Sequence, residues 1–264
     1  MVAARWEKGV TFPAPAIDTG AMYTDAEAAA LYDLVEAWDP DGHPADAHYH
    51  RLVMAAGDVL DVGCGTGGML HRARADGHTG RLAGLDPDAA VLARARRRTD
   101  VEWVPATAAE ASWDAEFDLA VMASHAFQYL VTDEDLRVSL AAIRSALRPG
   151  GRFAFETRHP GARAWEAWHP GNPSDVVDGA GRALRTWFEV DLVADGVVSY
   201  TGTIADADGT VLRVDRETLR FLDEEALDGF LAGAGFVVES RAGDWRGGPV
   251  TAGSREIVTV ARRA

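Results

Sequence analysis

Two hydrophobic periods alternate along the middle of the chain. Short apolar runs of strand length recur, and between them lie longer segments with apolar residues three or four positions apart. The runs predict strands, and the intervening segments predict helices, which favours a parallel sheet with right-handed crossovers and helices on both faces. The expected strands are 58–62, 81–86, 101–105, 117–122 and 151–157, and the expected helices are about 67–76, 88–98 and 134–147.

The pattern changes on both sides of this core. Ahead of it, residues 23–38 predict a helix capped by Thr24 or Asp25, and a second helix is expected at about 45–55. Residues 1–20 are rich in Pro, Gly and Ala and predict an extended arm.

Behind the core, three alternating runs are separated by Asp-Gly turns and predict an antiparallel insert. These runs are 183–193, 197–205 and 210–221, and a short helix or loop is expected before them at 158–168. A helix at 224–234 and a last hairpin of strands at 236–242 and 256–261 close the chain. The expected units are an N-terminal arm with lid helices (1–55), a core (56–157 and 222–264) and the insert (158–221).

The most informative motif lies where the first core strand turns into a helix. From Val59 to Leu70 the sequence reads VLDVGCGTGGML, and its glycines remove side chains where a ligand must approach the backbone. Asp86 ends the next apolar run, about 20 residues further on, where a nucleotide ribose is usually bound by a carboxylate. The two features favour a nucleoside-type cofactor. Asp86 alone also suits the capping of a helix that starts near Asp88.

Two cofactor classes fit the glycines. Gly63, Gly65 and Gly68 satisfy the dinucleotide pattern G-x-G-x-x-G, which leaves an NAD-dependent oxidoreductase as one alternative. Asp61 argues against a dinucleotide, because a carboxylate is unfavourable beside a pyrophosphate and suits a ligand with a cationic amino group. Asp61 as an acceptor that merely orders the loop remains a second interpretation.

With these residues the chain resembles class I S-adenosylmethionine-dependent methyltransferases, in which D-V-G-C-G-T-G is the first signature. The resemblance continues at Arg148–Gly151 and Ala234–Phe236 and extends over roughly residues 55–261. It implies an α/β, Rossmann-like sheet that is mostly parallel, with an antiparallel final hairpin and an antiparallel β insert covering the substrate site. It also implies S-adenosylmethionine as the cofactor.

The resemblance further implies which residues bind the cofactor. Those at the first glycine loop would surround the methionine end, and Asp86 would hold the ribose hydroxyls. Residues after the later strands would contact the adenosine and methionine moieties, and two tyrosines of the lid helix would close on the sulfonium. The implied set is Tyr23, Tyr32, Asp61, Gly63, Gly65, Asp86, Pro87, Thr107, Ala108 and Ser124. The tyrosines also suit ordinary packing of an amphipathic helix.

The segment after the fourth strand carries candidates for the transfer itself. His125 could accept a proton from the nucleophile or be a structural histidine, and Phe127 could shape the transfer cavity or belong to the core. Tyr23 joins these two as a catalytic candidate. Gln128 is expected to orient the acceptor, and Arg158 and His159 to bind an acceptor carboxylate or phosphate.

The Tyr23/Tyr32 arm and the loop at residues 125–128 resemble those of methyltransferases acting on antibiotic intermediates, and this resemblance implies methyl transfer to nitrogen of a small molecule: an amino sugar, an amino acid or an antibiotic intermediate. The transfer needs no covalent enzyme nucleophile, so the lack of a catalytic triad is compatible with it. Small-molecule O-methylation is the nearer alternative. A non-enzymatic protein that senses the cofactor is a more distant one, alongside the oxidoreductase.

The composition of the chain limits which substrates and which cellular compartment are expected. The formal net charge of −15 over 264 residues argues against a nucleic-acid substrate, because such enzymes present basic surfaces. The lone cysteine, Cys64, permits no internal disulfide and fits a reducing compartment. The N-terminus has no apolar signal core and no apolar run reaches membrane-spanning length, so we expect a cytoplasmic protein without membrane contact. We expect no metal, and a homo-oligomer stays open.

Overall fold

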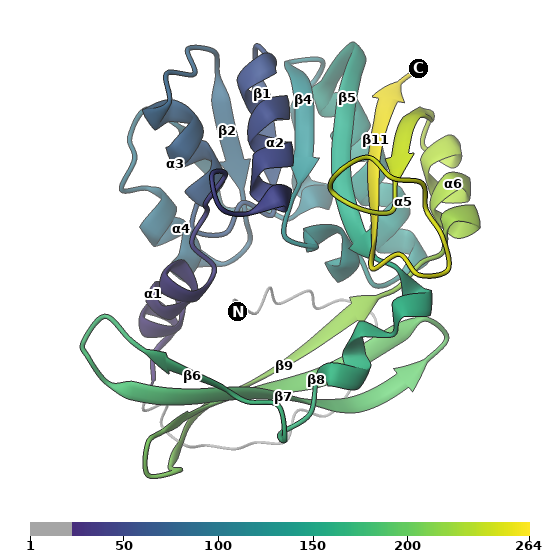
Figure 1. The fold of residues 1–264 in the computed structure, drawn as a ribbon. Helices are drawn as coiled ribbons and strands as arrows, with labels where there is room; N and C mark the ends of the chain where they lie inside the picture. The colour runs from purple at the N-terminus through teal and green to yellow at the C-terminus, as the bar shows by residue number, and fades with distance from the viewer. Residues whose placement is uncertain (1–22) are drawn as a thin grey trace.

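The computed structural model describes residues 23–264, which form two β-sheets with helices around the first (Figure 1). The first sheet has seven strands in the order β10-β11-β5-β4-β1-β2-β3. Strands β1 to β5 pair in parallel, and β11 is antiparallel to both of its neighbours, which confirms the predicted sheet. The strands are β1 (Val59–Val62), β2 (Leu82–Leu85), β3 (Glu102–Val104), β4 (Phe117–Met122), β5 (Leu147–Arg158), β10 (Phe236–Ala242) and β11 (Glu256–Arg263).

Helices cover both faces of this sheet (Figure 1). They begin where their sequences supply caps: the first one has the predicted capping box, in which Thr24 and Glu27 satisfy each other's backbone N–H groups. The last helix is capped by Asp223, whose side chain accepts a hydrogen bond from the backbone N–H of Ala226. The helices are α1 (Asp25–Val35), α2 (Pro44–Ala55), α3 (Gly68–Ala75), α4 (Ala89–Ala95), α5 (Asp133–Ala146) and α6 (Glu224–Gly233).

The second sheet is antiparallel, with the order β6-β7-β8-β9. Its strands are β6 (Ser174–Val177), β7 (Ala183–Ala194), β8 (Val197–Asp206) and β9 (Val211–Arg220). The last three correspond to the predicted runs. β6 was not predicted, because three of its four residues are exposed and its sequence lacks an alternating pattern.

Four short 3₁₀ turns complete the described chain. They are η1 (Ala108–Glu110), η2 (Ala126–Tyr129), η3 (Pro160–Ala162) and η4 (Ala164–Ala167). The last two occupy the segment for which a short helix or loop was expected.

The second sheet lies opposite the carboxyl ends of the parallel strands (Figure 1). Helix α1 connects the two parts: Leu31 packs with Leu184 and Leu212 of the second sheet, and Asp33 on the same helix bonds to Arg94 of α4 at 2.5 Å. The predicted arm at residues 1–20 lies outside the described residues. Within residues 23–264, no helix combines the length and the apolar character needed to cross a bilayer.

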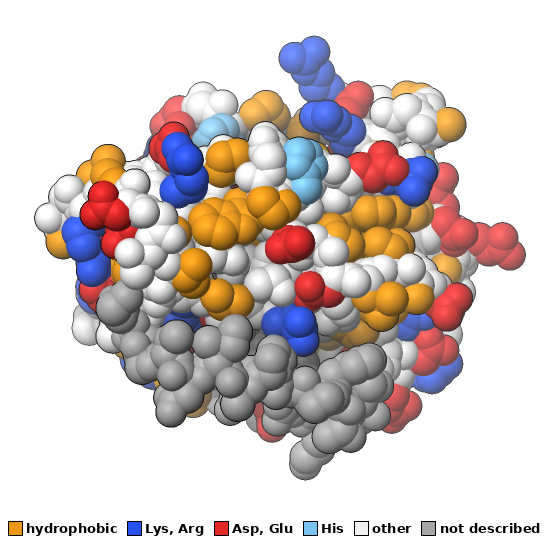
Figure 2. All heavy atoms as spheres, turned by 90° about the horizontal axis from the view of Figure 1, so that it is seen from below, with side chains coloured by type: hydrophobic (Ala, Val, Ile, Leu, Met, Phe, Trp, Pro, Cys, Tyr) orange, Lys and Arg blue, Asp and Glu red, His pale blue; other side chains and the backbone are white. Residues whose placement is uncertain are grey.

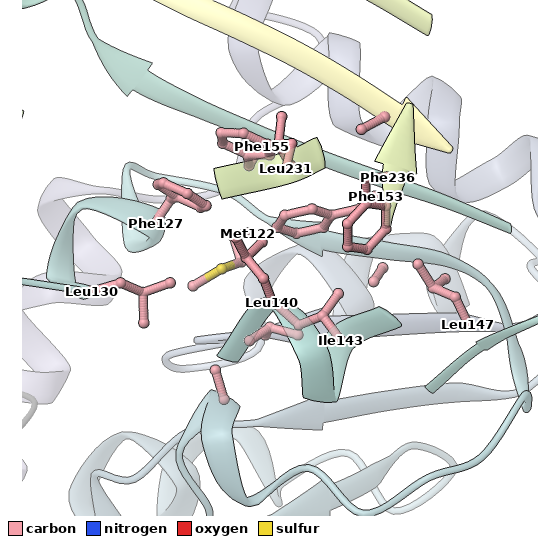
Figure 3. Close-up of a cluster of buried hydrophobic side chains, with 14 of the residues drawn as sticks. Met122, Phe127, Leu130, Leu140, Ile143, Leu147, Phe153, Phe155, Leu231 and Phe236 are labelled. Atoms are coloured by element: carbon pink, nitrogen blue, oxygen red, sulfur yellow. The ribbon is translucent and has the colours of Figure 1, made fainter. Parts of the chain in front are cut away.

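The main core lies between the first sheet and helices α5 and α6. Its centre is a run of aromatic rings in which Phe127 stacks on Phe155 with ring centroids 4.2 Å apart, and Phe153 stacks on Phe155 at 4.9 Å (Figure 3). Phe127 is only 2% exposed. Turn η2 directs this side chain into the core, which corrects the prediction that Phe127 contacts the acceptor or takes part in catalysis.

The outer surface of the second sheet is chemically mixed. Seen from that side, hydrophobic side chains lie among acidic and basic ones wherever the surface is not drawn in grey (Figure 2). Exposed aliphatic residues of this sheet include Val177, Leu192 and Val211.

Candidate active site

The glycine loop after β1 has the backbone that its sequence requires. Gly63, Gly65 and Gly67 have φ values of 77°, 54° and 80°, in the left-handed region that favours glycine. A Cβ at Gly67 would lie 2.5 Å from Trp103, so packing also disfavours a side chain there, and a Cβ at Gly63 would make a tight contact of 3.1 Å with Ala126. A Cβ at Gly65 would meet nothing within 4 Å. The backbone at Gly65 therefore borders open space that a ligand can approach.

Asp86 lies directly behind this loop at the end of β2. Its carboxylate accepts hydrogen bonds from the backbone N–H groups of Gly65 and Asp88, both at 2.9 Å. Burial raises the pKa of Asp86 to about 6. Asp88 is the residue that caps α4, since its side chain accepts from Ala90 and Val91. The capping alternative for Asp86 is therefore excluded.

Asp61, within β1, is a buried acid without a partner. Its side chain is 3% exposed, and no group within residues 23–264 donates a hydrogen bond to its carboxyl. Burial, followed by the nearby charge of Asp86, raises the pKa of Asp61 to about 8. The loop-ordering alternative is therefore not supported. An unpaired buried carboxyl group fits a cationic partner supplied by a ligand.

Helix α1 brings Tyr32 to the same edge. Its hydroxyl lies beside Ser124 and near Asp86, and burial raises its pKa to about 12. Ser124 and His125, which follow β4, have φ values of 55° and 61°. Two consecutive non-glycine residues in the left-handed region are unusual, and such strain is concentrated at functional sites.

A network of acids holds His125 in this conformation. The backbone N–H of His125 donates to Glu156 Oε1 at 2.7 Å, and its ring Nε2 lies 2.9 Å from Glu256 Oε2. The hydroxyl of Tyr49, from α2, donates to the other oxygen of Glu156. Burial raises the pKa of both Glu156 and Tyr49. His125 is thus fixed at its backbone and at one ring nitrogen.

Sequence analysis missed Tyr49 and Glu256 in this network. A usable signal existed for Glu256, because an antiparallel strand begins at the edge where its parallel neighbours end. Glu256 opens β11 and pairs with Arg158 at the end of β5. No sequence signal distinguished Tyr49, which reaches the edge only through the packing of α2.

The structure uses Gln128 as an internal connection. The side chain is fully buried; its Nε2 donates to the carbonyl of Arg220 at 3.0 Å and its Oε1 accepts from Arg158 at 3.0 Å. Both ends of the amide are occupied, which corrects the prediction that Gln128 orients the acceptor. Arg158 also lies over the ring of Trp168, 5.5 Å from its centroid. His159 accepts a hydrogen bond from Gly161 and caps η3.

Tyr23 points toward the second sheet rather than the glycine loop. Its hydroxyl donates to Asp178 at 3.5 Å, Arg182 lies over its ring, and the side chain is 1% exposed. This placement corrects the prediction of a contact with the sulfonium, because the tyrosine anchors α1 to the second sheet.

The remaining predicted residues follow β2 and β3. Thr107 forms a capping box with Glu110, to which its hydroxyl donates at 2.8 Å, and Ala108 is buried behind it. Pro87 is half-buried beside Asp86.

Comparison with known proteins agrees with this arrangement. Residues 59–151 match the family described as "Methyltransferase domain". The cypemycin N-terminal methyltransferase of a Streptomyces species is 27% identical over 261 residues, covering 90% of this chain and 97% of the relative.

Two solved structures share the fold over most of the chain. An amino pentose methyltransferase from Micromonospora echinaspora with bound S-adenosylmethionine has a TM-score of 0.64 at 24% identity, covering 89% of this chain and 97% of its own. A sugar N-methyltransferase from a Streptoalloteichus species has a TM-score of 0.66 at 24% identity, covering 89% and 93%.

The sheet order, the site and the matched methyltransferase domain agree with one another. Residues 59–151 form a methyltransferase domain, so the chain is a methyltransferase that uses S-adenosylmethionine, and it shares the fold of other methyltransferases with that cofactor. The oxidoreductase alternative is thereby rejected.

Proposed function

We propose that this enzyme methylates a nitrogen atom of a small molecule, such as an amino sugar, an amino acid or an antibiotic intermediate. One observation of the structure carries the proposal: the edge where β1, β2, β4, β5 and β11 meet is lined by carboxyl groups. An acidic site favours a cationic amine over a neutral or anionic acceptor. The acids are Asp61 and Asp86, which we assign to the cofactor below, and Glu156 and Glu256 beside His125, which make the acceptor side of the edge acidic.

The similarity to known enzymes supports the same choice of acceptor atom. The relative named as an N-terminal methyltransferase aligns with 90% of this chain, so the alignment extends well beyond the matched domain at residues 59–151. One of the solved structures of similar fold is a sugar N-methyltransferase.

For the cofactor, we assign roles to residues whose geometry fits it. Asp61 would bind the amino group, because it is a buried acid that lacks a partner. Asp86 would bind the ribose hydroxyls, and the open side of Gly65 would border the methionine moiety. Tyr32 and Ser124 would close the methionine end. We keep the adenosine contact assigned to three residues because they follow the ends of β2 and β3: Pro87, Thr107 and Ala108. When bound, the cofactor supplies an electrophilic methyl group on a sulfonium.

The enzyme's own residues position the acceptor and dispose of a proton. We assign the Nε2–H of His125 to its 2.9 Å contact with Glu256, which leaves the lone pair of the ring on Nδ1. Nδ1 has no hydrogen-bond partner within residues 23–264. An amine must be unprotonated before it attacks, and in our proposal Nδ1 would take that proton. Arg158 and His159 remain candidates for an anionic group of the acceptor.

A hydroxyl acceptor is the second candidate. The observation that favours it is the His125–Glu256 pair itself, because a hydroxyl depends on a base more strongly than an amine does. The two candidates therefore differ in how much activity survives without His125.

The test is a matched pair of acceptors with one skeleton. Glucosamine and glucose, or another amine and its alcohol, are incubated with enzyme and isotopically labelled S-adenosylmethionine, and products are identified by mass spectrometry. N-methylated product from the amine alone supports the proposal. O-methylated product alone refutes it in favour of the second candidate. In a His125→Asn variant, transfer to nitrogen should survive better than transfer to oxygen.

A further inference from the structure

A second buried acid, Glu217, lies on β9 of the second sheet, outside the site described above. It is directly opposite Tyr200 of β8 and is only 4% exposed. Its Oε2 accepts two hydrogen bonds, from the hydroxyls of Tyr200 at 2.6 Å and Tyr129. Its Oε1 is buried and accepts none from any residue within 23–264. A carboxylate oxygen left without a partner in the interior is costly, so its presence calls for an explanation.

Tyr129 connects this acid to the transfer edge. It ends turn η2, which begins directly after Ser124 and His125, and Gln128 in the same turn donates to the backbone of β9. Glu217 therefore faces the side of the second sheet that is turned toward the first sheet. This is the side on which an acceptor must lie to reach the carboxyl edge.

Aromatic rings contact Tyr200, one of the two tyrosines bonded to the acid. The ring of Tyr200 lies 4.8 Å from that of Trp168 and 5.5 Å from that of Phe188, measured between centroids. Trp168 and Phe188 are only half-buried, so this side of the aromatic cluster borders solvent. Ring faces attract cations, and rings grouped around a carboxylate form a common site for ammonium groups.

No cation of the described chain neutralises Glu217. Arg158 is the nearby candidate, but its guanidinium lies over Trp168 and donates to Gln128, and no ion pair joins it to Glu217. The geometry thus offers one free carboxylate oxygen with no positive charge from residues 23–264 bonded to it, and Arg158 contacts the neighbouring rings only at Trp168.

We propose that Glu217, Tyr200, Trp168 and Phe188 form the subsite that binds a cationic amine of the acceptor. An ammonium N–H donates to Glu217 Oε1, and the rings stabilise the charge. The subsite determines specificity, and the transfer takes place at the edge with His125. This inference rests on the proposed N-methylation, because it supplies the acceptor class on which that activity depends. A bound water at Oε1 is the competing explanation.

Binding without turnover tests the subsite directly. Enzyme saturated with S-adenosylhomocysteine is titrated calorimetrically with 2-phenylethylamine and with 2-phenylethanol, a neutral molecule of the same shape. We expect wild type to prefer the amine by at least about tenfold and Glu217→Gln to lose that preference. Glu189→Gln, at an exposed position of β7, is the matched control and should behave as wild type. Affinity for S-adenosylhomocysteine and the melting temperature should be unchanged in both variants.

Equal binding of amine and alcohol to wild type, or an unchanged preference in Glu217→Gln, would overturn the subsite in favour of water. If Glu217→Gln does not fold, the same titration is made on Trp168→Leu. The fold should tolerate this change, because Trp168 is only half-buried. The amine preference of this variant must fall, and a retained preference overturns the proposal. A different result would refute the proposed N-methylation and leave the subsite standing: wild type would bind amines at this subsite but yield only O-methylated products.

Discussion

The pH dependence of cofactor binding provides the sharpest test of the role of Asp61. This residue is buried, lacks a partner and has its pKa raised to about 8 by burial and then by Asp86. If a cationic amino group binds to it, only the ionised form binds well. We therefore expect affinity for S-adenosylhomocysteine to rise with pH.

The magnitude follows from the ionised fraction. With a pKa of about 8, roughly one Asp61 in a hundred is ionised at pH 6 and about half are at pH 8. Affinity should therefore increase about fifty-fold over that range, equivalent to about 2.3 kcal/mol, and then level off. Asp86, with its pKa of about 6, adds to the slope at the acid end.

The assay is calorimetric titration at half-unit steps of pH, on wild type and on Asp61→Asn. The variant should bind weakly, and most of the slope should be gone. Asp195→Asn, in the exposed turn between β7 and β8, serves as the control. Parallel slopes for wild type and Asp61→Asn would refute the assigned contact.

The effect of Asp61→Asn on protein stability provides an independent check that the Asp61 carboxyl lacks a partner in the protein. A raised pKa in the folded protein means that Asp61 favours folding when protonated, and this contribution is lost as pH rises through about 8. Without ligand, Asp61→Asn should therefore melt at a higher temperature than wild type at pH 8 to 9. A lower melting temperature there would show that the carboxylate is stabilised by groups of the protein itself.

Substitutions at four further positions test the site and the core. Asp86→Ala should cost about 2–4 kcal/mol of S-adenosylhomocysteine binding in calorimetry, whereas Asp86→Asn should cost less; equal losses would contradict a charge-assisted bond. Gly65→Ala should destabilise the fold by only about 1–2 kcal/mol in urea unfolding but reduce ligand affinity at least about tenfold; unimpaired binding would show that no ligand approaches Gly65. Phe127→Ala should cost about 3–5 kcal/mol of stability in the same unfolding assay, and a stable variant with a raised KM for acceptor would restore the contact rejected above. Glu256→Gln should lower kcat about a hundredfold for a hydroxyl acceptor and less for an amine, measured by product formation; an unchanged kcat for both would leave His125 a purely structural residue.

Much of the cofactor side could be predicted because its determinants are local. The alternation of strands and helices follows from hydrophobic period, and the left-handed turns at Gly63, Gly65 and Gly67 require glycine at those positions. Asp86 ends a strand next to that loop in a parallel sheet, where strand ends meet by topology.

The acceptor side could be predicted far less well, because side-chain direction there depends on packing between distant segments. Phe127 and Gln128 follow a strand end just as Ser124 does, yet turn η2 buries both. Tyr23 lies on the predicted lid helix but packs on the second sheet, since α1 spans the two parts of the fold.

The sequence by itself therefore determined the fold class, the glycine loop and the position of Asp86 beside it, because each depends on neighbours in the chain or on strand order. Only the tertiary structure decided that Glu256 pairs with His125, 131 residues earlier, and that Glu217 meets Tyr129, 88 residues earlier. These contacts depend on the register between β11 and β5 and on where the second sheet lies over the first. Neither is encoded in the local pattern of residues.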